Sequence, residues 1–170
     1  PYYITTPLIM SLLENRYQIE DIVVMVQKEV AERLTASPGT KEYGAVTLAV
    51  EYHAEAEILF PISRRLFQPV PEVDSALLRL KPRKAPPIQV CDEQLLFKII
   101  KAAFGQRRKT LVNSLAAMEA SLAKIKIAEI LVKTGIDPHT RGEVLSLAQF
   151  AQLTNLWAKA GEEEGKSENE

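Results

Sequence analysis

A basic, proline-rich segment at residues 81–87 divides this sequence into two parts with different folding patterns. Pro82, Pro86 and Pro87 each lack a backbone N–H and bias the preceding residue toward extended backbone, so neither a helix nor a central strand can continue through the segment. Strand-like and helix-like stretches alternate before it, whereas only helical spacing follows it. We therefore predict an α/β domain over residues 1–82, a helical domain over 83–160 and a disordered acidic tail over 161–170.

The α/β part carries three strand-like apolar stretches. Residues 22–26 form an unbroken, mostly β-branched run, which is typical of a strand covered on both faces, as in a parallel sheet. The other two stretches flank a proline-rich loop, which favours an antiparallel, hairpin-like pair. Thr6 followed by Pro7 predicts a helix start with the threonine as its N-cap. The other predicted elements are helices at 28–34 and 45–52 and strands at 57–62 and 75–80.

The helical part shows start and stop signals. Asp92 is placed to cap the first helix, and Ser146 with Gln149 forms a capping-box pattern in front of the last one. Glycines follow two of the helices, as they do at many helix ends. The predicted helices run from Asp92 to Phe104, over 109–118, over 125–133 and from Ser146 to Trp157. The expected fold class is therefore α/β followed by all-α.

Composition restricts the classes of protein that fit. The 170 residues are 46% hydrophobic and 25% charged, as in ordinary globular domains. No stretch is long and apolar enough to span a bilayer, and no signal peptide leads the chain. Cys91 is the only cysteine, which excludes an internal disulfide, and His53 and His139 have no neighbours at metal-ligand spacing. We expect a cytoplasmic monomer with no membrane partner and no metal.

Basic residues concentrate in the middle of the chain. Residues 63–109 contain 11 lysines and arginines but 4 acidic residues, although the whole chain has a net charge of −1. Such a local surplus is typical of a surface that binds a polyanion. The alternative is that these side chains are solvated on helix faces without a partner.

The proline-rich loop at 67–75 places an aromatic ring beside positive charge. Phe67 begins this loop, and Arg64 and Arg65 precede it. A flat apolar ring next to cations suits a nucleobase and its phosphate. The alternative is that Phe67 closes the end of the core, which is a common role of aromatic side chains. Asp74 stands directly before a strand, and we predict that it caps the loop instead of acting in catalysis.

Four stretches occur along the chain in an order typical of one protein family. They are Pro-Tyr-Tyr-Ile at 1–4; Gln-Lys-Glu-Val-Ala-Glu-Arg-Leu at 27–34 with Pro-Gly at 38–39 and Tyr-Gly at 43–44; Phe67 with Val-Asp-Ser-Ala at 73–76; and Phe-Gly-Gln-Arg-Arg-Lys-Thr-Leu at 104–111. Together they resemble the rRNA adenine N6-dimethyltransferase family. The likeness runs from Pro1 to about Leu153. It is greater to the small-subunit rRNA enzymes than to the macrolide-resistance methylases of large-subunit rRNA.

The resemblance implies that this chain is the C-terminal part of a Rossmann-like methyltransferase sheet plus a helical rRNA-recognition domain. It implies S-adenosylmethionine as the methyl donor and small-subunit rRNA in the assembling ribosome as the partner. The family's glycine-rich cofactor loop, its acidic ribose-binding residue and the Asn-Leu before Pro-Tyr are absent here and would lie upstream of Pro1. Since the chain also starts without methionine, we expect it to be the latter part of a longer enzyme and inactive alone.

The resemblance also implies roles for individual residues. The catalytic motif would contain Pro1 and Tyr2, with the Pro1 carbonyl accepting a hydrogen bond from the target amino group and drawing the lone pair back onto nitrogen. Tyr2 and Phe67 would stack on the two faces of the target adenine, and Tyr3 would pack in the protein. For Arg107 and Arg108, the alternative to RNA contact is that they stabilise the junction between the two domains. The expected RNA-binding residues are Arg64, Arg65, Arg107, Arg108 and Lys109.

Two other functions stay open from the sequence alone. A non-catalytic RNA-binding or ribosome-assembly module of methyltransferase ancestry would dock on RNA without transferring methyl groups. A mitochondrial-type transcription factor with the same fold is disfavoured, because no transit-like segment is visible. Steep salt dependence of RNA binding would separate either RNA-binding role from a purely structural domain.

Overall fold

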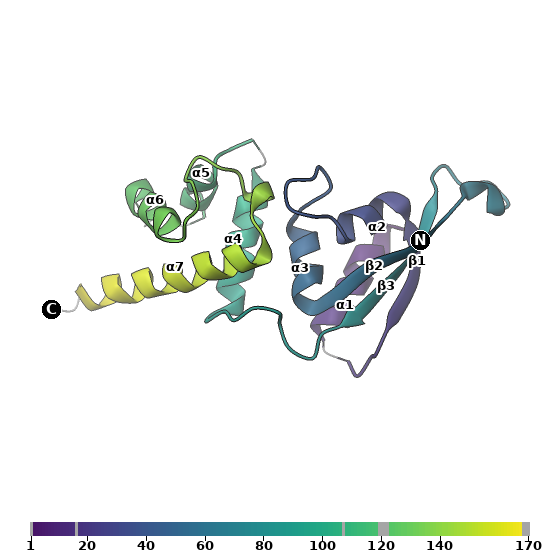
Figure 1. Ribbon diagram of the computed structural model, residues 1–170, viewed down its shortest axis with the longest axis horizontal. Coiled ribbons are helices and arrows are strands. Elements are labelled where there is room, and N and C mark those ends of the chain that lie inside the picture. The colour runs from purple at the N-terminus through teal and green to yellow at the C-terminus, as the bar shows by residue number, and fades with distance from the viewer. Residues whose placement is uncertain (1, 16, 107, 119–122, 168–170) are drawn as a thin grey trace. The chain divides into compact units, whose positions relative to one another are not determined.

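The computed structural model describes residues 2–15, 17–106, 108–118 and 123–167, with side chains from Tyr3 to Gly161 within these ranges. The chain forms two compact units, Pro1–Pro87 and Ile88–Glu170. The first unit combines a sheet with helices, and the second unit is helical (Figure 1). The predicted fold class, α/β followed by all-α, is confirmed.

The sheet of the first unit has three strands in the order β1-β3-β2. The strands are β1 (Ile22–Gln27), β2 (Ala54–Ile62) and β3 (Ser75–Pro82). Both pairings are antiparallel, and Leu78 of the central strand lies opposite Val24 on one side and Ile58 on the other. The predicted antiparallel pair is therefore confirmed. The predicted parallel setting of β1 is wrong within the described part of the chain, because its neighbour there is β3, which runs in the opposite direction.

Helices cover one face of this sheet. They are α1 (Thr5–Glu14), α2 (Lys28–Leu34) and α3 (Ala45–His53), and a 3₁₀ turn, η1 (Tyr2–Ile4), precedes α1. Residues from all three helices and all three strands form a single buried cluster, so this face supplies the core of the unit. Its members are Ile9, Leu13, Ile22, Val26, Ala31, Leu34, Val50, Ala54, Ala76, Leu78 and Leu80.

The start of α1 differs from the sequence prediction. The N-cap is Ile4, which makes no side-chain capping bond, and Thr6 lies inside the helix. Ile4 already has helical backbone angles, φ −96° and ψ −3°, because the chain enters α1 directly from the η1 turn. A helix that continues an existing turn does not need the side-chain acceptor that a free N-terminus requires.

The other face of the sheet is open in the described structure. Val23 and Met25 of β1 are 51% and 45% exposed, and Phe60 of β2 is 52% exposed. Met25 and Phe60 both lie opposite Leu77, so these side chains form one apolar row across the three strands. The prediction that both faces of β1 are covered is therefore wrong for this chain, in which the run alternates between buried and exposed residues.

The second unit is built from four helices in its described part. They are α4 (Glu93–Gly105), α5 (Leu111–Ala116), α6 (Lys124–Lys133) and α7 (Leu147–Ser167), and a 3₁₀ turn, η3 (Gly142–Val144), precedes α7. Apolar residues of all four helices are fully or almost fully buried and form the core of this unit. None of the described helices is both long and apolar enough to cross a membrane.

The predicted helix caps of the second unit are confirmed. The Asp92 side chain accepts a hydrogen bond from the Leu95 N–H at 3.0 Å. The Gln149 side chain accepts a bond from the Ser146 N–H at 3.0 Å, and the Ser146 hydroxyl oxygen accepts one from the Gln149 N–H at 3.4 Å. Gly135, with φ +73°, follows the end of α6 in the left-handed conformation that glycine adopts readily.

The predicted disordered tail differs from the structure over residues 161–167. The backbone of α7 stays helical to Ser167. Glutamate has high helix propensity, and extending an existing helix costs far less than starting one.

Candidate functional site

The loop between β2 and β3 places Phe67 at the end of a short turn. Ser63 caps the 3₁₀ turn η2 (Arg64–Leu66), with its hydroxyl oxygen accepting from the Arg65 N–H at 3.3 Å. The Phe67 N–H donates to the Arg64 carbonyl oxygen at 3.2 Å. Phe67 is half-buried, whereas the neighbouring Leu66 is 77% exposed. The phenyl ring is therefore held against the protein without being sealed inside the core.

Asp74 links the two ends of this loop, as predicted for a structural aspartate. Its carboxylate oxygen Oδ1 accepts a hydrogen bond from the Arg64 N–H at 2.9 Å. Its backbone carbonyl accepts one from the N–H of Lys28, the first residue of α2, at 3.0 Å. The loop that carries Phe67 is thus attached to the junction between β1 and α2.

Arg64 is bonded to its own loop, and Arg65 is exposed beside it. The Arg64 guanidinium donates from Nη1 to the Glu72 carbonyl oxygen at 2.7 Å. Both arginines are exposed. The structure therefore brings Arg64, Arg65 and Phe67 together in one loop, as the sequence indicated.

Other basic residues of the first unit are bonded within that unit. Arg79 of β3 makes a double contact with the Asp21 carboxylate, at 2.7 and 3.1 Å, and reaches Glu57 at 3.3 Å. Arg83 donates to the Glu51 carbonyl oxygen at 3.2 Å and to the Glu55 carboxylate at 2.9 Å. The basic surplus counted in the sequence is thus partly neutralised inside the unit.

In the second unit, Arg108 and Lys109 lie in the turn that joins α4 to α5. Both are exposed, and the Lys109 N–H donates to the Gln106 carbonyl oxygen at 2.9 Å. The prediction that a helix begins at Lys109 is wrong, because α4 ends at Gly105 and α5 begins at Leu111. Side chains in such a turn can point outward together, which suits contact with successive phosphates.

Two of the predicted site residues lie outside the described residues, and a third is described only in part. Pro1 and Arg107 are not described, and of Tyr2 the structure describes only the backbone, within η1. The expected pairing of the Tyr2 and Phe67 rings stays a prediction, because the Tyr2 side chain lies outside the described part of the chain. Tyr3, which was expected to pack in the protein, is 83% exposed in the η1 turn.

A cavity of about 440 Å³ adjoins the Phe67 loop. It is lined by the junction of β1 with α2 and by the two ends of the loop, including Lys28, Arg64 and Asp74. Its lining carries four carboxylates and two cations, so its charge does not favour an RNA phosphate. The lining residues are Gln27, Lys28, Glu29, Glu32, Arg64, Glu72, Val73 and Asp74.

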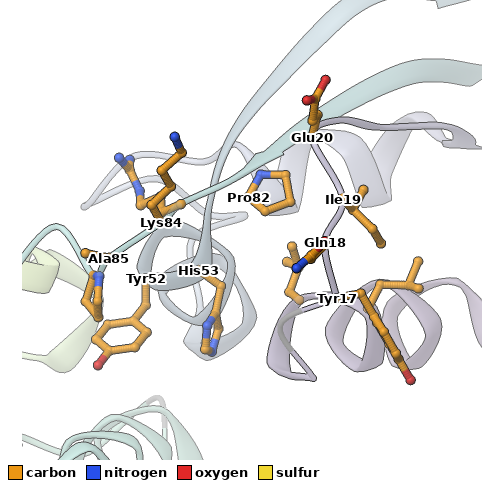
Figure 2. A pocket seen from close by; sticks show the side chains of 13 residues that line it. Tyr17, Gln18, Ile19, Glu20, Tyr52, His53, Pro82, Lys84 and Ala85 are labelled. Atoms are coloured by element: carbon orange, nitrogen blue, oxygen red, sulfur yellow. The ribbon is translucent and has the colours of Figure 1, made fainter.

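A second cavity, of about 460 Å³, lies at the opposite end of the sheet, where β1 begins and β3 ends (Figure 2). Tyr52 and His53 at the end of α3 line it, with their ring centroids 5.0 Å apart and their planes at 84°. Leu12 and Leu13 of α1, the segment at 17–20 and the proline-rich connector at 82–86 complete it. Sequence reasoning missed this cavity because its lining comes from four separate stretches of chain.

The described residues do not provide a cradle for a nucleotide-like cofactor or a metal. β1 passes directly into α2 at Gln27 and Lys28, without the glycine-rich turn that lets a backbone approach a cofactor closely. No cluster of three or more potential metal ligands occurs among the described side chains. What this part of the molecule can offer is therefore a stacking surface, hydrogen-bonding backbone and exposed cations.

Comparison with known proteins identifies the family. The family model described as "Ribosomal RNA adenine dimethylase" matches residues 1–159. This chain belongs to the ribosomal RNA adenine dimethylase family. It is 51% identical over 160 residues to "Ribosomal RNA small subunit methyltransferase A" of Geobacillus kaustophilus (strain HTA426), and the match covers 93% of this chain and 55% of the relative. The protein of the same description from Pelotomaculum thermopropionicum is 50% identical over 161 residues, covering 95% and 55%.

Solved structures show the same fold. A dimethyladenosine transferase from Plasmodium falciparum has a TM-score of 0.77 and 23% identity, and the match covers 95% of this chain and 65% of that one. The 23S rRNA methyltransferase ErmE has a TM-score of 0.65 and 24% identity, covering 92% and 62%. The fold is therefore that of the Rossmann-like rRNA methyltransferases. The chain spans about half the length of the curated relatives it matches.

Proposed function

We propose that this chain is the target-base and RNA-binding portion of an enzyme that dimethylates the N6 amino group of adenines in small-subunit rRNA during ribosome assembly. The observation that carries this proposal is the half-buried Phe67 ring beside Arg64 and Arg65 in a loop braced at both ends. Family membership supports rRNA as the substrate. The relatives described as small-subunit methyltransferases support the choice of subunit.

A target adenine has to leave its helix before it can react. Unstacking a base costs a few kcal/mol, and stacking on an aromatic ring returns about 1 to 3 kcal/mol. In this proposal Phe67 supplies one stacking face and Tyr2 the other, while the Pro1 carbonyl accepts from the target N–H. Arg64, Arg65, Arg107, Arg108 and Lys109 contact phosphates on the strands that flank the target.

S-adenosylmethionine is the methyl donor in this proposal, and residues that are not in this chain hold it. The proposal includes that the chain alone is inactive, and the direct passage from β1 into α2 without a glycine-rich turn supports it. The working protein is a cytoplasmic monomer whose partner is the assembling small subunit, without metal and without a membrane.

The decisive experiment replaces the matching region of the Geobacillus kaustophilus relative with this chain. Methyl transfer to unmethylated small-subunit rRNA particles is then compared between the parent and the graft. Activity in the graft within about tenfold of the parent supports the function, since the sequences are 51% identical over the exchanged region. An inactive graft that is folded and binds the particles contradicts it and favours the second candidate, a non-catalytic RNA-binding module.

A further inference from the structure

We propose that Asp74 and Arg64 are positioning residues, which fix the Phe67 ring for the target base through the backbone of their shared loop. This inference rests on the proposed function, because it assigns the part of the site that holds the stacking ring in place. Neither residue touches the base in this account. Both act on Phe67 through hydrogen bonds.

The bonds form a continuous chain from the sheet to Phe67. Lys28, at the junction of β1 and α2, donates its N–H to the Asp74 carbonyl at 3.0 Å. The Asp74 carboxylate accepts from the Arg64 N–H at 2.9 Å, and the Arg64 carbonyl accepts from the Phe67 N–H at 3.2 Å. Each hydrogen bond on this path therefore fixes the residue that makes the next one. Phe67 is linked to the frame of the sheet in three bonds.

A second bond closes the loop from its other side. The Arg64 guanidinium donates from Nη1 to the Glu72 carbonyl at 2.7 Å. Arg64 thus contributes its N–H, its carbonyl and its side chain to the same loop, between the segment that carries Phe67 and the segment that returns to β3. A guanidinium is suited to this role because its planar donors have fixed directions.

The frame to which the loop is attached is rigid. Ser75, which follows Asp74, is fully buried at the start of β3, and Val26 at the end of β1 is fully buried as well. Gln27 and Ser75 lie opposite each other in the sheet. Asp74 is therefore adjacent to two strands that are fixed by pairing and burial. Its hydrogen bonds connect these strands to a loop that has few buried contacts of its own.

The exposure of these groups separates a positioning role from a stabilising one. Asp74, Arg64 and Glu72 are all exposed, so their hydrogen bonds compete with water and contribute little to the free energy of unfolding. Removing the Asp74 carboxylate is therefore expected to loosen the loop while the fold stays intact. A displacement of the ring by about 1 Å can cost about 100-fold in rate.

A carboxylate near a reaction centre can also be a base, and the two roles make different predictions. Asp74→Asn keeps an oxygen that can accept from the Arg64 N–H but removes the charge and the basicity. Asp74→Ala removes the acceptor as well. Rescue by asparagine therefore indicates positioning, whereas equal loss in both variants indicates that the charge or the basicity is required.

The first test uses this chain and needs no activity. Amide hydrogen exchange of Arg64 and Phe67 is measured in the wild type, Asp74→Ala and the control Glu72→Ala, which removes a carboxylate from the same loop but leaves the Glu72 carbonyl that Arg64 binds. We expect at least about tenfold faster exchange in Asp74→Ala alone, with an unchanged unfolding midpoint. Unchanged exchange rates at both amides would contradict the proposal that Asp74 holds this loop in place.

The second test measures methyl transfer in the graft described above. Asp74→Ala is expected to lower kcat about 10- to 100-fold with KM for the rRNA particle within about twofold, while Asp74→Asn and Glu72→Ala stay near the wild type. Full activity of Asp74→Ala, or equal loss in Asp74→Asn, overturns the positioning role and leaves the proposed function standing. Full activity of Phe67→Ala would instead show that the Phe67 ring does not stack on the target base. Asp74 would then have no role in catalysis through that ring.

Discussion

Gly142 lies so close to Ala103 that a side chain would not fit between them. A β-carbon on Gly142 would be 2.7 Å from the Ala103 β-carbon and 3.2 Å from its carbonyl oxygen. Gly142 begins the η3 turn, and Ala103 is a buried residue of α4, so the contact sets how closely that turn approaches the helix. Gly142→Ala is expected to cost about 1 to 3 kcal/mol in the free energy of unfolding, as overpacking does elsewhere. Urea denaturation of the chain measures this.

Gly105 provides the matched control for that substitution. It is the last residue of α4, and open space surrounds the position of its β-carbon. Gly105→Ala is expected to cause no loss and to gain up to about 1 kcal/mol, because alanine has the higher helix propensity. Equal stability of the two variants would show that the backbone around Gly142 moves aside without cost.

The cap of α7 offers a second stability prediction. Ser146 and Gln149 exchange hydrogen bonds at 3.0 and 3.4 Å, and Phe150 in the first turn of the helix is fully buried. Ser146→Ala is expected to lower the free energy of unfolding by about 1 kcal/mol, whereas Ser146→Asp should keep most of the cap. Chemical denaturation followed by helical circular dichroism distinguishes the variants. Equal midpoints would mean that packing alone fixes the start of α7.

Sequence reasoning succeeded where the physical cause was local. The caps at Asp92 and Ser146 and the glycine after α6 need partners within a few residues, so their pattern is visible in the sequence. The cap at Thr6 failed for a related reason. The preceding turn, which makes the cap unnecessary, has no sequence signal as strong as a threonine before a proline.

Sequence reasoning failed where pairing partners were distant. The apolar run of β1 predicts that both of its faces are buried, but it cannot show the direction of the neighbouring strand or whether another segment covers each face. Val23 and Met25 are exposed, and β1 pairs with a strand about 50 residues later in the chain.

In the candidate site, too, relationships between neighbours in sequence could be predicted and those between distant residues could not. Phe67, Arg64 and Arg65 are neighbours in sequence, so the sequence could place them together, and Asp74 could be recognised as a loop cap. The partner of Asp74 could not, because the Arg64 N–H lies at the far side of the loop. The cavity of Figure 2 was invisible for the same reason, since four segments form it.

Glu51 predicts a pH dependence of stability. Glu51 is exposed as a residue, but partial desolvation of its carboxyl raises the pKa of that group above its ordinary value of 4.5, and the nearby Arg83 only partly offsets this. The unfolded chain therefore releases this proton at lower pH than the folded chain, so the fold loses stability as the pH rises through that interval. Glu51→Gln is expected to raise the free energy of unfolding at pH 7 and to leave it nearly unchanged at pH 3.

RNA binding by the turn between α4 and α5 is expected to depend on salt. Each phosphate contact adds about 0.7 to 0.9 to the slope of log K against log salt concentration. Arg108→Ala and Lys109→Ala should each weaken binding to small-subunit rRNA and reduce the slope by about one contact. Filter binding of this chain to small-subunit rRNA between 50 and 200 mM salt measures this slope. Lys133→Ala removes one charge from the exposed surface of α6 and should change the slope less; equal changes would indicate nonspecific attraction.

The Phe67 ring can be tested by a series of substitutions in the graft. Loss of a stacked aromatic ring costs about 1 to 3 kcal/mol, so Phe67→Ala is expected to lower kcat/KM about 5- to 150-fold. Phe67→Tyr and Phe67→Trp keep a flat ring and should retain most of the activity. Phe67→Leu keeps an apolar side chain without a π-face. If leucine restores activity as well as tyrosine does, the ring acts by packing and not by stacking on a base.

The matched control for that series is Leu66→Ala. Leu66 is 77% exposed in the same turn, so its removal changes the apolar surface of the loop without touching the Phe67 ring. We expect Leu66→Ala to keep kcat/KM within about twofold of the wild type. Because Phe67 is half-buried, the free energy of unfolding is measured for every variant. A loss of activity that follows the loss of stability across the series would assign Phe67 to the core, which is the alternative that the sequence left open.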